Sequence, residues 1–95
     1  MDKDLIIQEV VTVIRRYLDE TYQVFIFGSW ARGNARETSD IDIGILGQEK
    51  VSRIIMYKIL GEVENIKTLR TIDVVDFNTK NKNFKENVLA YAKVL

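Results

Sequence analysis

Two aspartates stand two residues apart in an apolar stretch of this sequence. Asp40 and Asp42 alternate with three isoleucines, Ile41, Ile43 and Ile45, which is the pattern of a β-strand with two different faces. Residues i and i+2 of a strand point the same way and lie about 7 Å apart. Two like charges aimed at one spot repel unless a cation or a proton relieves them. The pair therefore predicts a divalent metal site, against the alternative of two solvated polar positions.

Two glycines add to this prediction. Gly44 follows on the aspartate face and predicts room for a bound group above the strand. Upstream, an apolar strand ends at Gly28, and we expect Ser29 to be the N-cap of one helical turn within 29–38. Free backbone amides at such a turn, with a hydroxyl and a glycine, form a pocket for phosphate oxygens. Gly-Ser also ends many ordinary strands, so this signal is weak alone.

A third carboxylate is expected from a later strand. Asp73 shares a strand face with Val75, whereas Asp76 shares the opposite face with Val74. Spacing does not decide which face is open, so Asp73 is the first candidate by position and Asp76 the reserve. Either one is as readily explained as a polar residue at a strand end.

Three further side chains lie near the Gly-Ser turn. Arg32 and Arg36 flank it and are candidates for contact with phosphate, although most surface arginines are simply solvated. Trp30 is a candidate for stacking on a base, for covering the turn or for facing a partner protein, and we expect it to cover the turn.

Composition limits the available chemistry. The chain has no cysteine and no histidine, which excludes thiolate and imidazole ligands and histidine acid–base catalysis. Metal binding must then use oxygen ligands, which select hard cations such as Mg²⁺ or Mn²⁺. The 14 basic and 14 acidic residues cancel, so no net field favours direct binding of nucleic acid or a membrane surface. The absence of a long apolar run and of a signal peptide predicts a cytoplasmic protein.

The chain of 95 residues is expected to form one domain over 1–95. Apolar spacing predicts three longer helices, at 4–19, 50–64 and 84–95. Short β-branched and aromatic runs predict three strands, at 22–27, 39–46 and 70–77, with a basic loop at 80–85. The predicted fold is α+β: a small mixed sheet of three core strands flanked by helices, in the order helix, strand, turn, strand, helix, strand, helix.

The motif as a whole resembles a known family. Gly28-Ser29, ten residues, Asp40-Ile41-Asp42 and a later strand aspartate resemble the nucleotidyltransferase superfamily that includes DNA polymerase beta. The string Gly-Ser-Trp-Ala-Arg-Gly-Asn-Ala-Arg-Glu-Thr-Ser-Asp-Ile-Asp is similar to its smallest branch, the minimal nucleotidyltransferases (MNT), often encoded beside a HEPN-domain partner. The resemblance runs from the first helix to the third strand, and the family fold agrees with the predicted element order.

The resemblance implies metal-dependent transfer of AMP from ATP to a hydroxyl. Asp40, Asp42 and Asp73 would hold the metal, and Asp73 would also help to deprotonate the acceptor. Gly28 and Ser29 would hold the outer phosphates. The implied acceptor is a HEPN ribonuclease toxin, with this chain as its antitoxin, in a homo- or hetero-oligomer.

The sequence leaves two other functions open. An antitoxin could neutralise its partner by binding alone, through apolar and aromatic residues such as Trp30, Met56, Tyr57 and Tyr91. A small-molecule nucleotidylyltransferase of the aminoglycoside type ranks last, because the chain is short for an acceptor site unless a homodimer builds one.

Overall fold

The computed structural model describes residues 2–95. Its elements are α1 (Lys3–Tyr17), β1 (Gln23–Phe27), α2 (Ser29–Arg32), β2 (Ile41–Leu46), α3 (Arg53–Glu64), β3 (Ile72–Asp76), a 3-10 turn η1 (Phe77–Thr79), α4 (Lys82–Leu89) and β4 (Lys93–Val94). The α+β class and the predicted order from the first helix to the third strand are confirmed.

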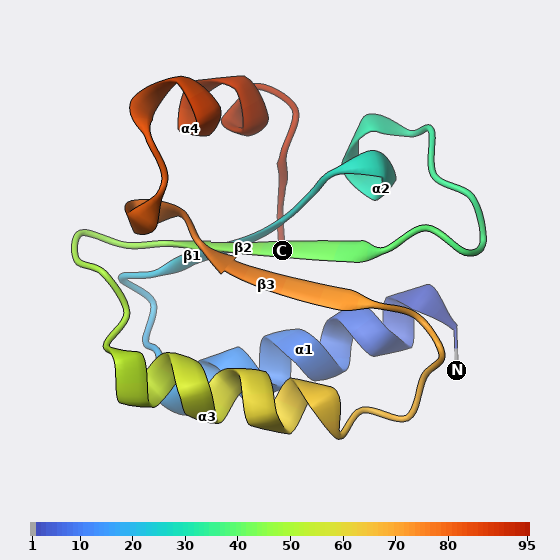
Figure 1. Cartoon of the computed structure of the whole chain (residues 1–95), viewed down its shortest axis with the longest axis horizontal. Coiled ribbons are helices and arrows are strands. Elements are labelled where there is room, and N and C mark those ends of the chain that lie inside the picture. The colour runs from blue at the N-terminus through green and yellow to red at the C-terminus, as the bar shows by residue number, and fades with distance from the viewer. Residues whose placement is uncertain (1) are drawn as a thin grey trace.

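The strands form one mixed sheet in the order β3-β2-β1-β4. β1 pairs antiparallel with β2 and with β4, and β2 pairs parallel with β3. Figure 1 shows α1 and α3 side by side on one face of the sheet and α2 and α4 on the other. The parallel pair requires a crossover, which α3 supplies between β2 and β3.

The face covered by α1 and α3 holds the larger core. The isoleucines of β2, Ile41, Ile43 and Ile45, are fully buried there with Val24 and Ile26 of β1 and Val74 of β3. α1 adds residues at helical spacing, Ile6, Val10, Val13 and Ile14. Asp2 caps this helix by accepting from the backbone amides of Asp4 and Leu5. The side chains of Arg16 and Tyr17 both donate to Glu62, which joins α1 to α3.

The opposite face holds a smaller, aromatic core. The ring of Phe77 meets Phe25 and Phe27 edge-on, with ring centroids 4.8 and 5.0 Å apart. Val88 of α4 packs on this cluster. The cluster fills only part of the face, and Asp42 and Asp73 lie on the remainder.

The C-terminal prediction was wrong in its details. The helix expected over 84–95 begins earlier, at Lys82, and ends at Leu89, so it replaces part of the expected basic loop at 80–85. The chain then adds a fourth strand, in which Val94 pairs with Phe25. A strand of two residues carries no periodic signal, so only its pairing with β1 defines it. Among residues 2–95, no helix is long and apolar enough to cross a membrane.

Candidate active site

The carboxylates of Asp42 and Asp73 come from neighbouring strands. Because β2 and β3 are parallel and Asp42 is in register with Asp73, both side chains leave the sheet on the same face. Phe27, the last residue of β1, is the register partner of Asp42 on the other side. This pairing places the end of β1, and Gly28 after it, directly beside the aspartates.

Gly28 and Asp42 are in close contact. A Cβ atom added to Gly28 would lie 2.1 Å from Oδ2 of Asp42, and Gly28 has a φ of 72°. Both facts require glycine at this position, since a side chain would clash and would strain the backbone. Glycine thus lets the carboxylate of Asp42 lie against the start of the helical turn.

The pKa of the Asp42 carboxyl is raised from 3.8 to about 6. Burial is the largest cause, followed by the negative charges of Asp73 and Asp40, while Arg32 opposes the shift. The structure therefore concentrates carboxylates where they repel one another. Such an arrangement favours a cation at this face of the sheet.

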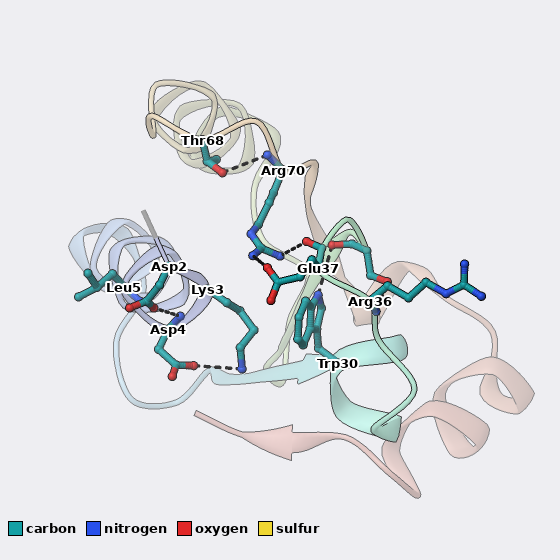
Figure 2. Close-up of polar contacts among 10 residues, drawn as sticks. Asp2, Lys3, Asp4, Leu5, Trp30, Arg36, Glu37, Thr68 and Arg70 are labelled. Carbon is teal, nitrogen blue, oxygen red and sulfur yellow. Dashed lines mark hydrogen bonds and ion pairs between the residues drawn. The ribbon is translucent and has the colours of Figure 1, made fainter.

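Asp40 lies in the exposed segment just before β2, and its charge is close enough to contribute to the raised pKa of Asp42. The segment leading to it, residues 33–40, is called here the aspartate loop. Trp30 donates from Nε1 to the carbonyl of Ser39, at 3.2 Å, next to Asp40. Figure 2 shows the indole directly below this loop.

Asp76 has a different environment from Asp73. It is 7% exposed and faces the core beneath α1 and α3. Its Oδ2 accepts from the amide of Val51, at 2.8 Å, and its Oδ1 from the amide of Asn78, at 3.0 Å. One oxygen thus holds backbone just before α3, and the other holds backbone just after β3. The structure places Asp73, and not Asp76, beside Asp42.

One helical turn follows Gly28, as predicted, but its N-cap is not the predicted residue. Gly28 is the N-cap of α2 and Ser29 is its first residue, so the expected N-cap role of Ser29 was wrong. The first amides of any helix lack intrahelical acceptors, and the N-cap Gly28 that precedes them here lies against Asp42. Gly33, with a φ of 84°, ends the turn in the left-handed conformation.

The two arginines near the turn point in different directions. The guanidinium of Arg32 lies 5.0 Å from the ring centroid of Tyr91 and close enough to Asp42 to affect its pKa. Arg36 is exposed, and Figure 2 shows its side chain extending away from Trp30 into solvent. Tyr91 was not predicted at this site, since no local spacing connects it with the turn.

The space expected above Gly44 is occupied. A Cβ atom on Gly44 would lie 2.3 Å from the ring of Phe25 and 2.9 Å from the ring of Phe77. Glycine is needed there so that two aromatic rings can pack on β2, and the prediction of a bound group over Gly44 was wrong.

The donor set nevertheless suits a hard cation. Among residues 2–95, no three carboxylates lie close enough together to enclose a metal ion by themselves. Mg²⁺ does not need such a cage, because it is usually held by one or two carboxylates, several waters and substrate phosphates. Asp42 and Asp73, with Asp40 nearby and the first amides of α2 alongside, fit that mode of binding.

Comparison with known proteins gives a consistent result. The family described as "Polymerase beta, Nucleotidyltransferase" matches residues 8–95. A relative from Methanocaldococcus jannaschii, MJ1215, named as a protein adenylyltransferase, is 37% identical over 79% of this chain and 86% of its own length. A second, MntA of Haemophilus influenzae, also named as a protein adenylyltransferase, is 26% identical over 81% of this chain and 68% of its own.

Solved structures agree on the fold. A structure described as a minimal nucleotidyltransferase is 26% identical, with a TM-score of 0.74, and the match covers 100% of this chain and 97% of that one. The MNT antitoxin in a complex with tri-AMPylated HEPN toxin from Shewanella oneidensis has a TM-score of 0.70 at 17% identity, over 98% of this chain and 71% of that one. The sequence match over nearly the whole chain and the shared fold show that this chain belongs to the polymerase beta nucleotidyltransferase family.

Proposed function

We propose that this chain is a metal-dependent protein adenylyltransferase that transfers AMP from ATP to a hydroxyl of a HEPN-domain toxin, and that it acts thereby as an antitoxin. The names of the relatives support adenylyl transfer to protein. The solved complexes of similar fold support a HEPN partner and, through a complex with AMP-PNP, an adenine nucleotide. The single observation that carries the proposal is the carboxylate of Asp42 lying against Gly28 and beside Asp73.

Each residue has a proposed role. Asp40, Asp42 and Asp73 hold Mg²⁺ or Mn²⁺ together with phosphate oxygens. The bound cation neutralises charge on the triphosphate and helps to align it. The backbone amides at Gly28 and Ser29, with the Ser29 hydroxyl, bind the outer phosphates.

The arginines have a secondary role in the proposal. Arg32 lies on the aspartate side of the turn and is well placed to neutralise the triphosphate or the departing pyrophosphate. Arg36 is the outer candidate and reaches a phosphate only by turning back from its present direction.

The proposed transfer is a single displacement at the α-phosphorus. The acceptor oxygen forms a bond to this phosphorus as the bond to the β-phosphate oxygen breaks, and pyrophosphate leaves. Asp73, which is exposed at the open face, accepts the proton of the acceptor hydroxyl. The acceptor comes from another molecule, which explains how a chain with one small sheet can catalyse the transfer.

Neutralisation by binding alone has less support. Of the four residues considered for a docking surface, Tyr57 alone is exposed, at 80%. Trp30 is partly buried and bonded to the aspartate loop, and Met56 and Tyr91 are half-buried against the core. The carboxylates of the site, moreover, carry an energetic cost that a purely structural surface does not require.

The test is label transfer with the HEPN protein of the same organism, purified and mixed with this chain, Mg²⁺ and ATP. We expect label from α-³²P-ATP on the toxin and none from γ-³²P-ATP. The matched variant is Asp42→Asn, which removes a proposed metal ligand with little change in size. Loss of both label and cell protection in this variant supports chemistry as the function. Full protection without label would refute it in favour of binding, and no label with the wild type would refute the proposed activity.

A further inference from the structure

The aspartate loop is bonded to the segment that leads into β3. The backbone amide of Ile41 donates to the carbonyl of Thr71, at 2.9 Å. Within the loop, Ser39 and Arg36 exchange two hydrogen bonds: the Ser39 amide donates to the Arg36 carbonyl and the Arg36 amide to the Ser39 hydroxyl. The residue after Asp40 is therefore bonded to the segment just before β3, and the residue before it is bonded within the loop.

Arg70 contacts the aspartate loop from 33 positions further along the chain. Its Nη1 donates to the carbonyl of Glu37, at 2.5 Å, and its guanidinium lies 5.5 Å from the ring centroid of Trp30. Trp30 in turn donates to Ser39. Figure 2 shows Arg70 reaching across to the loop, with the indole beneath the contact. One cation thus holds both the loop backbone and the indole that supports it.

The burial of Arg70 indicates a specific role. Its side chain is 16% exposed, which is unusual for arginine because a buried charge is costly unless it is paired and hydrogen-bonded. The carboxylate of Glu37 also pairs with it, at 3.2 Å, but the Glu37 side chain is 92% exposed. An ion pair so open to water contributes little. The carbonyl of Glu37 and the indole are therefore the important partners.

We infer that Arg70 is a positioning residue for Asp40: it fixes the aspartate loop so that the carboxylate of Asp40 is presented on the same face as Asp42 and Asp73. This inference rests on the proposed function, because it assumes that Asp40 is a metal ligand. Arg70 itself touches neither nucleotide nor metal in this scheme. Its loss should weaken metal binding and loosen the loop, with the rest of the fold unchanged.

The first experiment measures Mn²⁺ binding by calorimetry in the presence of α,β-methylene-ATP. Arg70→Gln should weaken Mn²⁺ affinity about tenfold, the usual effect of removing a group that orients a metal ligand. Glu37→Gln keeps the main-chain carbonyl and should stay within about twofold of wild type. Arg53→Gln makes the same substitution at an exposed arginine of α3, away from the loop, and should also stay within about twofold.

A second readout separates positioning from general destabilisation. Amide hydrogen exchange of residues 36–41 should become about tenfold faster in Arg70→Gln, while exchange of the core amides of α1 and β1 stays unchanged. If Arg70→Gln does not fold, Arg70→Lys replaces it; lysine keeps the charge but not the planar contact, and an affinity loss of about threefold is then expected.

Three outcomes would overturn the inference: equal Mn²⁺ affinity in the Arg70 variant and wild type, equal exchange at 36–41, or an equal affinity loss in Glu37→Gln. Failure of the wild type itself to bind Mn²⁺ with the nucleotide would instead refute the proposed function, so the two failures are distinguishable.

Discussion

Replacing Asp42 with asparagine should stabilise the fold. The carboxyl of Asp42 is half-buried and lies beside Asp73 and Asp40, and this environment raises its pKa to about 6. At neutral pH the folded protein therefore holds Asp42 ionised in a place that disfavours the charge. Asparagine has nearly the same shape and no charge, so it removes the penalty.

The expected gain follows from the pKa. A rise from 3.8 to about 6 corresponds to about 3 kcal/mol, at about 1.4 kcal/mol per unit. Water reaches part of this carboxyl and screens its charge, so we expect a smaller gain of about 1 kcal/mol at pH 7. The same substitution removes a proposed metal ligand, so stability should rise as activity falls, as in other strained sites.

The pH dependence of the free energy of unfolding tests independently whether ionised Asp42 destabilises the fold. Because the folded-state pKa lies above the unfolded one, the folded protein binds more protons than the unfolded chain between about pH 4 and pH 6. The wild type should therefore lose stability relative to Asp42→Asn as the pH rises through about 6. The gap should be largest at pH 7 to 8 and vanish near pH 4.

The assay is urea unfolding followed by fluorescence of Trp30, the single tryptophan, with EDTA present so that no divalent cation offsets the repulsion. Asp76→Asn is the matched control, and it should lower the free energy of unfolding where Asp42→Asn raises it. Asp76 accepts two backbone amides in the core, so its loss should cost about 2 kcal/mol. A less stable Asp42→Asn variant at pH 7, or a gap that does not shrink on acidification, would refute this account of the site.

Two further predictions concern the surroundings of the site. Gly44→Ala should cost about 1–3 kcal/mol in urea unfolding, because its methyl group would overlap the rings of Phe25 and Phe77; a change within about 0.5 kcal/mol would contradict the packing described here. Arg32→Gln should weaken binding of α,β-methylene-ATP about tenfold through a lost charge-assisted contact, whereas Arg36→Gln should stay within about twofold. Calorimetry with Mg²⁺ measures both, and equal losses would show that the two arginines are not distinguished as proposed.

The parts of the site that sequence predicts correctly are those fixed by local geometry. The opposite faces of Asp42 and its buried neighbours Ile41 and Ile43 follow from strand alternation. The single helical turn after Gly28 is likewise local. These features need no knowledge of which elements pack together.

The remaining features depend on contacts between distant segments. Asp73 and Asp76 have opposite faces by alternation, but only the packing of α1 and α3 on one face decides which aspartate is buried. Local spacing cannot show that Gly44 is covered, because Phe77, which packs on it, lies 33 positions further along the chain. The contacts of Arg70 with Glu37 and Trp30 also join segments that are far apart in the sequence, and no spacing rule connects these residues.

The most direct test of the central claim is to locate the metal and the nucleotide together. Crystals of this chain grown with Mn²⁺ and α,β-methylene-ATP would give an anomalous difference map at the manganese edge. We predict a peak in contact with the carboxylates of Asp42 and Asp73, with the triphosphate against the backbone of Gly28 and Ser29. A nucleotide bound elsewhere, or a manganese peak away from these aspartates, would contradict the assignment of this face as the nucleotidyl-transfer site.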